Sequence, residues 1–340
     1  MPLTAPPRPV VDNPAGWLHA ALLTALLLAP AADACSVYGK GWGSKWDNPI
    51  WPNGATITWS FMTPGVALGP AAPPAWNGTN SLGTGSPADL RVKIDTVHGA
   101  GAFNAAVQRA FNTWSAAANL QFVQVADQGG AFGTVAAPDI RIGAFSFGAG
   151  DLSGAAGFGP PGDDVNFPDA LAGDIAFNSA NNFNIDPGAE GDPLQTGPGG
   201  LYLNDIEGLL LHEIGHTLGI GHSQEPSAIL CGYQSPNFDG SSCDYAHVNR
   251  VLTPDDLNAV RNIYGPAPPP DGDVSFDCRV DAADVLLVNQ ILLKQLLPNA
   301  AQRARADVAP LVSGTPLPDG EVTTADFLAI LQKSLRQISY

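Results

Sequence analysis

The chain has 340 residues, which at roughly 100–200 residues per domain allows two or three domains, and 45% of them are hydrophobic, which excludes a wholly disordered chain. Its 32 acidic residues against 15 Lys and Arg give a net charge of −17, so nucleic acid and anionic membrane surfaces are poor partners. The same acid excess suits the binding of divalent cations.

The first segment has the pattern of a secretory signal peptide. Residues 17–30 (WLHAALLTALLLAP) form an apolar run that is short for a membrane span, which needs roughly 20 residues. Ala32-Asp33-Ala34 follows as an A-x-A cleavage signal. We therefore predict a signal peptide over residues 1–34, a secreted product, and no membrane span in the mature chain. An uncleaved anchor, or lipid attachment at Cys35, is the alternative.

Export permits disulfides, and the four cysteines allow three pairings. Cys231 and Cys243 would close a short loop, so we predict a bridge between them. The pairing of Cys35 and Cys278 stays open.

The larger block, residues 35–265, mixes strand and helix patterns. Alternation predicts a first strand over 55–61, and apolar spacing predicts an amphipathic helix over 102–117. Thr253, followed by proline and two acids, is typical of a helix start, and that helix should run to Tyr264 and stop at Gly265. Further elements are expected as short strands over 120–125, 139–142 and 173–177, and as a long helix over 201–218.

A Pro-rich linker, residues 266–270, leads to a smaller block over 271–340. This block contains an internal repeat, because residues 279–286 align with 321–328 and the identities continue beyond them. Two loop-helix units of one kind are the simplest interpretation.

A cluster of three histidines indicates a metal site. His212 and His216 are four residues apart, which places them on one face of a helix, where both can ligate one zinc. Glu213 lies beside them and can act as general base toward a water molecule on the metal. Gly219 permits a sharp turn that returns His222 as third ligand. Three protein ligands leave one position open, which is typical of a catalytic zinc and not a structural one.

The extended motif resembles that of the metzincin metalloproteases, and His222-Ser223 is similar to the matrixin branch. The predicted elements over 102–117, 139–142 and 173–177 are similar to matrixin landmarks in the same order. The resemblance implies an α+β zincin domain, with a twisted mixed sheet and three helices, over residues 35–265. It also implies a zinc-dependent endopeptidase acting on protein or peptide substrates.

Three features depart from the family. Ser227-Ala228-Ile229-Leu230 stands in place of the methionine turn, and we expect Leu230 to form the apolar floor, since Leu and Met are close in volume. Ala176 and Asn178 stand where animal matrixins have a second set of zinc ligands, so one zinc is expected. The stretch between the signal and the first strand is too short for a cysteine-switch prodomain. Tyr233 has the wrong offset for the usual tyrosine and is left out of the catalytic set.

The smaller block contains a loop with the ligand spacing of an EF-hand-type calcium site. Side-chain oxygens, and one carbonyl at Arg279, fall at positions 1, 3, 5, 7, 9 and 12, as Asp273, Ser275, Asp277, Arg279, Asp281 and Asp284. A helix over 283–297 should follow. The second copy keeps Asp319, Glu321 and Asp326, whereas Asp307 could serve as first ligand only across an inserted Pro-rich stretch.

This pattern resembles a dockerin repeat and implies a small all-α domain that binds one or two calcium ions and docks to a cohesin-like partner. A different class of function stays open, in which the chain is a secreted calcium-dependent scaffold or adhesion component with an impaired protease domain. The complete histidine set and Glu213 argue against that alternative, and the missing methionine argues weakly for it.

Overall fold

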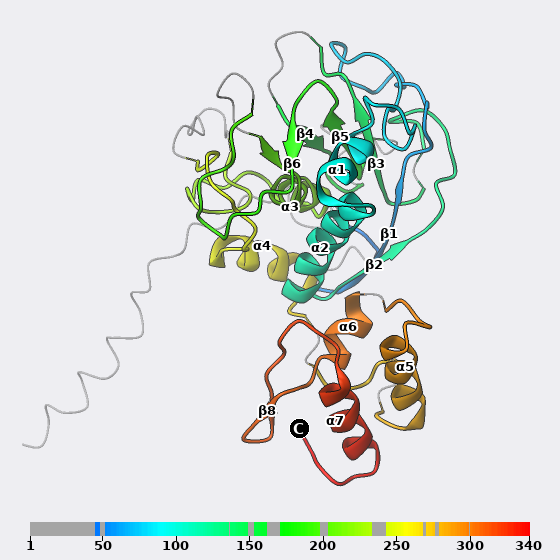
Figure 1. Ribbon diagram of the computed structural model, residues 1–340, viewed down its shortest axis with the longest axis vertical. Helices are drawn as coiled ribbons and strands as arrows, with labels where there is room; N and C mark the ends of the chain where they lie inside the picture. The colour runs from blue at the N-terminus through cyan, green and yellow to red at the C-terminus, as the bar shows by residue number, and fades with distance from the viewer. Residues whose placement is uncertain are drawn as a thin grey trace, which may run out of the picture. The chain divides into compact units, whose positions relative to one another are not determined.

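The computed structural model describes residues 45–47, 52–135, 137–148, 153–161, 171–197, 203–232, 243–267, 270–275, 279–298 and 300–340. Figure 1 shows the helices and strands of the larger and the smaller block. The hydrophobic cores of the two blocks are separate. Within the described ranges no helix has the length and apolar character needed to cross a membrane. The predicted signal peptide and the residues Cys35, Tyr233, Asp277 and Cys278 lie outside these ranges.

A five-stranded mixed sheet organises the larger block. Its order is β2-β1-β3-β5-β4, and only β4 runs antiparallel to its neighbour. The strands are β1 (Ala55–Phe61), β2 (Leu120–Gln124), β3 (Ile140–Phe145), β4 (Ala155–Gly157) and β5 (Asp174–Asn178). Every residue of β3 and β5 is buried, as expected for central parallel strands that are covered on both faces. Four of these strands were predicted, and β4 was not.

Four helices lie in the described part of this block, one more than the three expected. They are α1 (Leu90–His98), α2 (Ala102–Ala117), α3 (Ile206–Thr217) and α4 (Pro254–Tyr264). The predicted bounds of α2 and α4 are confirmed, and Thr253 and Asp256 form a capping box at the start of α4. The indole N–H of Trp114 on α2 donates to the Leu211 carbonyl of α3 at 3.0 Å, which joins the two long helices (Figure 1).

Helix α3 begins later than the sequence suggested. Asp205 is its N-cap and accepts the N–H of Gly208 at 2.9 Å, so residues before it are not helical. Two of those residues, Asn204–Asp205, form β7, which pairs with β6 (Phe183–Asn184). Arg250 donates to the same Asp205 carboxylate at 2.8 Å. The start of α3 is therefore fixed by chain segments distant in sequence.

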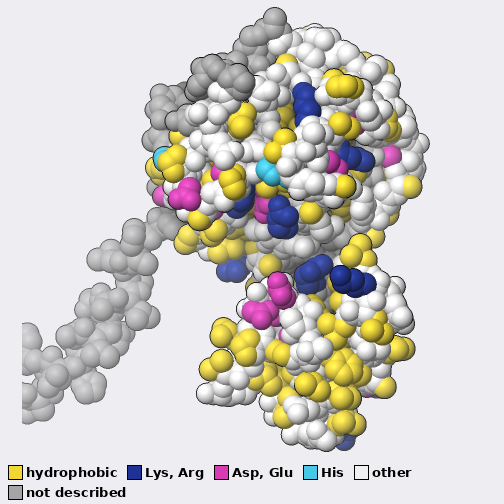
Figure 2. Space-filling view, viewed as in Figure 1, with side chains coloured by type: hydrophobic (Ala, Val, Ile, Leu, Met, Phe, Trp, Pro, Cys, Tyr) yellow, Lys and Arg dark blue, Asp and Glu magenta, His cyan; other side chains and the backbone are white. Residues whose placement is uncertain are grey.

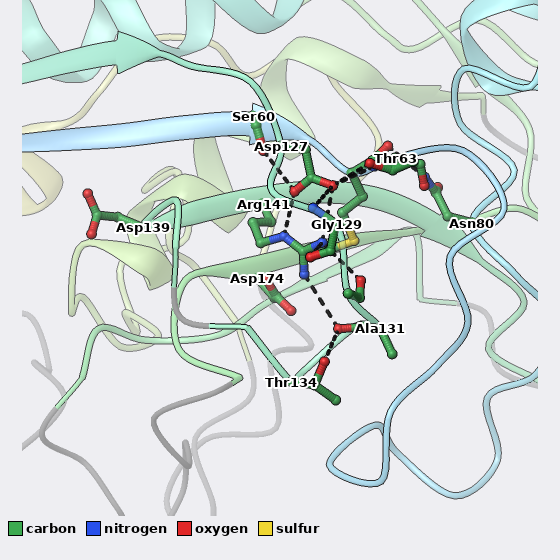
Figure 3. A network of polar contacts seen from close by, with 12 residues as sticks. Ser60, Thr63, Asn80, Asp127, Gly129, Ala131, Thr134, Asp139, Arg141 and Asp174 are labelled. Atoms are coloured by element: carbon green, nitrogen blue, oxygen red, sulfur yellow. Dashed lines mark hydrogen bonds and ion pairs between the residues drawn. The ribbon is translucent and has the colours of Figure 1, made fainter.

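A buried ion pair fixes the loop that precedes β3. The Arg141 side chain is fully buried, and its Nε donates to Asp127 Oδ1 at 2.8 Å (Figure 3). The same guanidinium donates to the carbonyls of Gly129 and Gly130 at 3.2 and 3.1 Å. Burial alone would raise the pKa of Asp127, but hydrogen bonds from Arg141 and Thr63 prevail and lower that pKa to about 2.

A second buried carboxyl, that of Asp174, lies close to this ion pair (Figure 3). Asp174, at the start of β5, accepts the N–H of Gly133 at 2.9 Å. Burial raises the pKa of Asp174 to about 8, because this hydrogen bond and the nearby Arg141 charge offset only part of the desolvation. Asp174 therefore stays protonated in the folded protein near neutral pH.

The smaller block contains α5 (Ala282–Leu292), α6 (Ala300–Ala306) and α7 (Thr324–Ser334). Helix α5 ends before the predicted residue 297, and Lys294 just beyond it has a positive φ of 56°. The sequence predicted a purely helical block, but β8 (Leu311–Val312) and β9 (Thr315–Pro316) form a hairpin within it. The repeat is visible in the capping boxes that begin α5 and α7.

Candidate metal centre

Three imidazole rings converge at the end of helix α3. The Nε2 atom of His216 lies 3.0 Å from that of His212 and 3.1 Å from that of His222. Nitrogen ligands of a tetrahedral zinc, with Zn–N of about 2.0–2.1 Å, stand about 3.3–3.4 Å apart, so this set fits zinc. In the described part of the chain, this is the only group of three or more His, Cys, Asp or Glu residues whose ligand atoms lie within 4.8 Å of one another.

Backbone carbonyls orient two of the rings. His212 Nδ1 lies 2.7 Å from the Ile229 carbonyl and His216 Nδ1 lies 2.9 Å from the Ile220 carbonyl, so each Nδ1–H donates outward and leaves Nε2 for the metal. Burial, and then the neighbouring imidazoles, lower the pKa of His212 to about 4 and that of His216 well below its usual value. Both rings are thus neutral, which is the form that ligates metal.

Glu213 lies next to the histidines and is packed against the edge strand β4. A Cβ on Gly157 would lie 2.5 Å from the Glu213 carbonyl oxygen and 3.1 Å from its Oε2, so only glycine permits this approach. Glu213 is 5% exposed, and burial raises its pKa to about 8 against the opposing effect of the Gly157 hydrogen bond. Nothing in the local sequence indicates that Gly157 contacts Glu213.

A cleft of about 740 Å³ lies over the histidines and Glu213. Most of the described residues that line it come from the segment around β4, from β7 and helix α3, and from the chain from His222 onward, and Leu194 lines it as well. They include Phe158, Leu209, Tyr245 and His247. The cleft therefore brings an edge strand, the predicted ligands and Glu213 to one accessible surface.

Residues 229–232, here the floor segment, lie beneath the histidines. Leu230 is fully buried, and its Cδ2 lies 2.6 Å from where a Cβ on Gly215 of α3 would stand. The Asp256 carboxylate accepts the N–H groups of Ile229 and Leu230 at 3.0 and 3.1 Å. Sequence reasoning assigned Asp256 only to a helix start, because nothing local shows that it also reaches the floor segment.

The next residue of this segment, Cys231, forms a disulfide with Cys243. The pairing is the one that the sequence suggested. Cys231 is buried, and both cysteines line the cleft.

The comparisons with known proteins decide the family of this fold and site. The Matrixin family model matches residues 91–265, just over half of the chain, and the match includes Glu213 and all three histidines. This chain belongs to the matrixin family. The resemblance seen in the sequence of the larger block is thereby confirmed, and residues 91–265 are its matrixin region.

Relatives of this matrixin come from animals and plants. It is 29% identical to interstitial collagenase A of Mus musculus over 199 residues, which are 51% of this chain and 33% of that protein. It is 32% identical to metalloendoproteinase 1-MMP of Arabidopsis thaliana over 166 residues, 47% of this chain and 37% of that protein. It is 34% identical to matrix metalloproteinase-16 of Homo sapiens over 103 residues, which are 29% of this chain and 14% of that protein. The chain thus matches at most 37% of the length of these relatives.

The matrixin match ends before the predicted calcium loops. In the first loop, Asp284 accepts the N–H groups of Ser275 and Asp281 at 2.8 Å, and Asp273 is paired with Arg305 at 3.1 Å. Asp277 lies outside the described residues. No three of the described loop carboxylates come within 4.8 Å of one another.

The second loop has an insertion. Asp307 accepts the N–H groups of Asp319 and Gly320 at 3.1 and 2.7 Å, and Asp326 accepts that of Ala309 at 2.7 Å. Asp307 and Asp319 are twelve positions apart, whereas Asp273 and Asp277 are four apart, and the β8–β9 hairpin accounts for the difference. Glu321 is exposed at the surface of this loop.

Proposed function

We propose that this matrixin is a secreted zinc-dependent endopeptidase. The observation that carries the proposal is the convergence of three imidazole Nε2 atoms beside Glu213 in one open cleft. His212, His216 and His222 would hold one zinc ion. When bound, zinc polarises the scissile carbonyl and makes a water molecule more acidic.

The chain's own residues supply the proton transfer and the substrate binding. Glu213 acts as general base toward the attacking water and then donates the proton to the leaving amine. Strand β4 (Ala155–Gly157) is at the edge of the sheet and lines the cleft. None of the described strands pairs with its outer edge, so this edge can pair with an extended peptide main chain, which would place a peptide bond next to Glu213.

Casein hydrolysis tests this proposal. We expect hydrolysis by the purified protein to be lost with a zinc chelator and restored by added zinc. Glu213→Ala should retain zinc yet lose turnover by orders of magnitude, whereas Glu225→Ala, which removes an exposed acid, should retain both. Zinc-loaded wild type that hydrolyses nothing would favour the impaired scaffold, and turnover by Glu213→Ala would show that the base is wrongly assigned.

For export, we infer cleavage after Ala34, and N-terminal sequencing of the secreted product should begin at Cys35. A product that begins elsewhere would contradict this site.

For the smaller block, we propose a calcium-binding, dockerin-like module. Support comes from the two equivalent capping boxes and from Asp307, which lies beside Asp319 as a first ligand would. The ions would be held by Asp273, Ser275, Asp277, the Arg279 carbonyl, Asp281 and Asp284 in the first loop, and by Asp307, Asp319, Glu321 and Asp326 in the second. Calcium would replace Arg305 as the cation beside Asp273.

A protein partner, cohesin-like by resemblance, is the proposed ligand of this module. Leu286 and Leu328 occupy equivalent repeat positions on α5 and α7, and both are more than half exposed. Hydrophobic side chains are frequent on the visible face of this block (Figure 2). Binding of a cohesin domain to the full chain should need calcium and fail in Leu286→Asp/Leu328→Asp. Cohesin binding that persists both without calcium and in the Leu286→Asp/Leu328→Asp variant would contradict this assignment.

A further inference from the structure

The floor segment (229–232) touches the metal ligands along its length. The Ile229 carbonyl accepts the Nδ1–H of His212, and Leu230 lies beneath helix α3 as described above. Gly232 lies against the ring of His222, since a Cβ on it would lie only 2.4 Å from His222 Cδ2. A displacement of this segment would therefore move the groups that orient the ligands.

Hydrogen bonds fix one part of the floor segment. The Asp256 carboxylate accepts the N–H groups of Ile229 and Leu230, as described above. In addition, the Leu230 carbonyl accepts the N–H of Ser223 at 2.7 Å, and the N–H of Gly232 donates to the Ser223 carbonyl at 3.2 Å. Ser223 directly follows His222. The floor segment and the third ligand are thus paired side by side, and Cys231 lies within that pairing.

The disulfide partner belongs to the cleft wall. Residues 243–249, here the wall segment, contribute Cys243, Asp244, Tyr245, His247 and Asn249 to the cleft lining. Hydrogen bonds also hold this segment independently of the disulfide. Asp244 donates to the Pro226 carbonyl at 3.2 Å, and Val248 donates to the Asp192 carbonyl at 2.8 Å. The Cys231–Cys243 bond therefore ties the floor of the metal site to a separately anchored part of the molecule.

We propose that the Cys231–Cys243 disulfide is a positioning device that holds Gly232 against His222 and so slows the release of zinc. This inference rests on the zinc assignment proposed above. Without the bond, only the main chain joins Gly232 to the wall segment, and the 3.2 Å hydrogen bond to the Ser223 carbonyl alone opposes the withdrawal of Gly232 from His222. Metal retention then depends on the redox state of the pair.

The corresponding switch is an ordinary thiol–disulfide exchange. A dithiol reductant donates two electrons and two protons to the pair, which becomes two thiols, and the reductant becomes a disulfide. An oxidising compartment would keep the protease loaded with zinc, whereas a reducing one would favour loss of the metal.

The test uses the full chain with Cys35→Ser and Cys278→Ser, so that only this pair reacts. In this zinc-loaded background we would measure zinc release into a chromophoric chelator, with and without Cys231→Ser/Cys243→Ser. Removal of a group that supports a metal ligand costs about 10–100-fold in metal affinity, so release should be roughly 10-fold faster or more. Val107→Ala, a buried change in α2, is the control for general destabilisation.

A second measurement keeps the test valid if the double variant folds poorly. The pair is reduced in the folded protein and rejoined with a methylene bridge, which should restore slow release while the reduced form stays fast. The inference would be overturned if the protein without the disulfide released zinc no faster than Val107→Ala, compared at an equal loss of melting temperature. A background protein that binds no zinc at all would instead refute the proposed function.

Discussion

Replacing Arg141 by methionine should destabilise the matrixin region. The change keeps most of the side-chain volume but removes the positive charge that Asp127 faces. The exposed fractions of the two side chains are 0% and 5%, so water cannot take over that role. The carbonyls of Gly129 and Gly130 lose a donor as well. Asp127 keeps the N–H and hydroxyl of Thr63, each at 2.8 Å, which limits the damage.

The size of the effect follows from these contacts. Removing one partner of a buried ion pair costs about 3–5 kcal/mol, and the Thr63 bonds place Arg141→Met near the lower end, about 3 kcal/mol. At about 2–4 °C per kcal/mol, the melting temperature should fall by roughly 6–12 °C. The low pKa of Asp127 adds a pH signature, because its stabilising effect is present above the unfolded pKa of 3.8 and is lost as pH falls toward about 2.

Calorimetry of the wild type and of three variants tests this prediction. Arg109→Met is the matched control, since Arg109 is 48% exposed in its pair with Glu207 and should cost at most about 1 kcal/mol. Arg141→Met/Asp127→Asn should recover part of the loss, because no unpaired charge stays buried. The reasoning would be refuted if Arg141→Met melted at the wild-type temperature, or if its melting temperature fell by no more than that of Arg109→Met.

Three further predictions concern other sites. Burial raises the pKa of Asp174 to about 8, so between pH 3.8 and about 8 the carboxyl ionises in the unfolded chain but stays protonated in the fold. Stability should therefore fall as pH rises through this range, and Asp174→Asn should flatten that loss in denaturant titrations at several pH values. Leu230→Met should change casein hydrolysis little and stability by under about 1.5 kcal/mol, whereas a large gain in rate would indicate an impaired wild type. Millimolar calcium should raise the melting temperature of the smaller block in the full chain, and by less after Asp273→Ala/Asp284→Ala, which removes the first site, with hydrolysis unchanged.

Local signals predicted much of this structure. Helices α2 (Ala102–Ala117) and α4 (Pro254–Tyr264) follow their apolar spacing and caps, which are properties of a few neighbouring residues. The metal centre was predictable for the same reason, since a helix fixes the relative positions of His212 and His216. Only the turn at Gly219, where φ is 92°, had to be inferred to add His222.

Long-range contacts account for what the sequence did not reveal. Helix α3 starts at Asp205 because Arg250, far along the chain, and the β6–β7 pair fix that end. Arg141 reads as an ordinary strand residue, and no local pattern links it to Asp127. The second loop of the smaller block was obscured by the β8–β9 hairpin, which separates Asp307 from the rest of its repeat.

The central claim is that three histidines hold one catalytic zinc. X-ray absorption at the zinc edge of the purified protein measures the ligands of that ion directly. We predict one zinc per chain with three imidazole nitrogens at about 2.0–2.1 Å, one further oxygen and no sulfur, and loss of one imidazole in His222→Ala. A zinc bound through sulfur at about 2.3 Å, or an unchanged spectrum in that variant, would contradict the account.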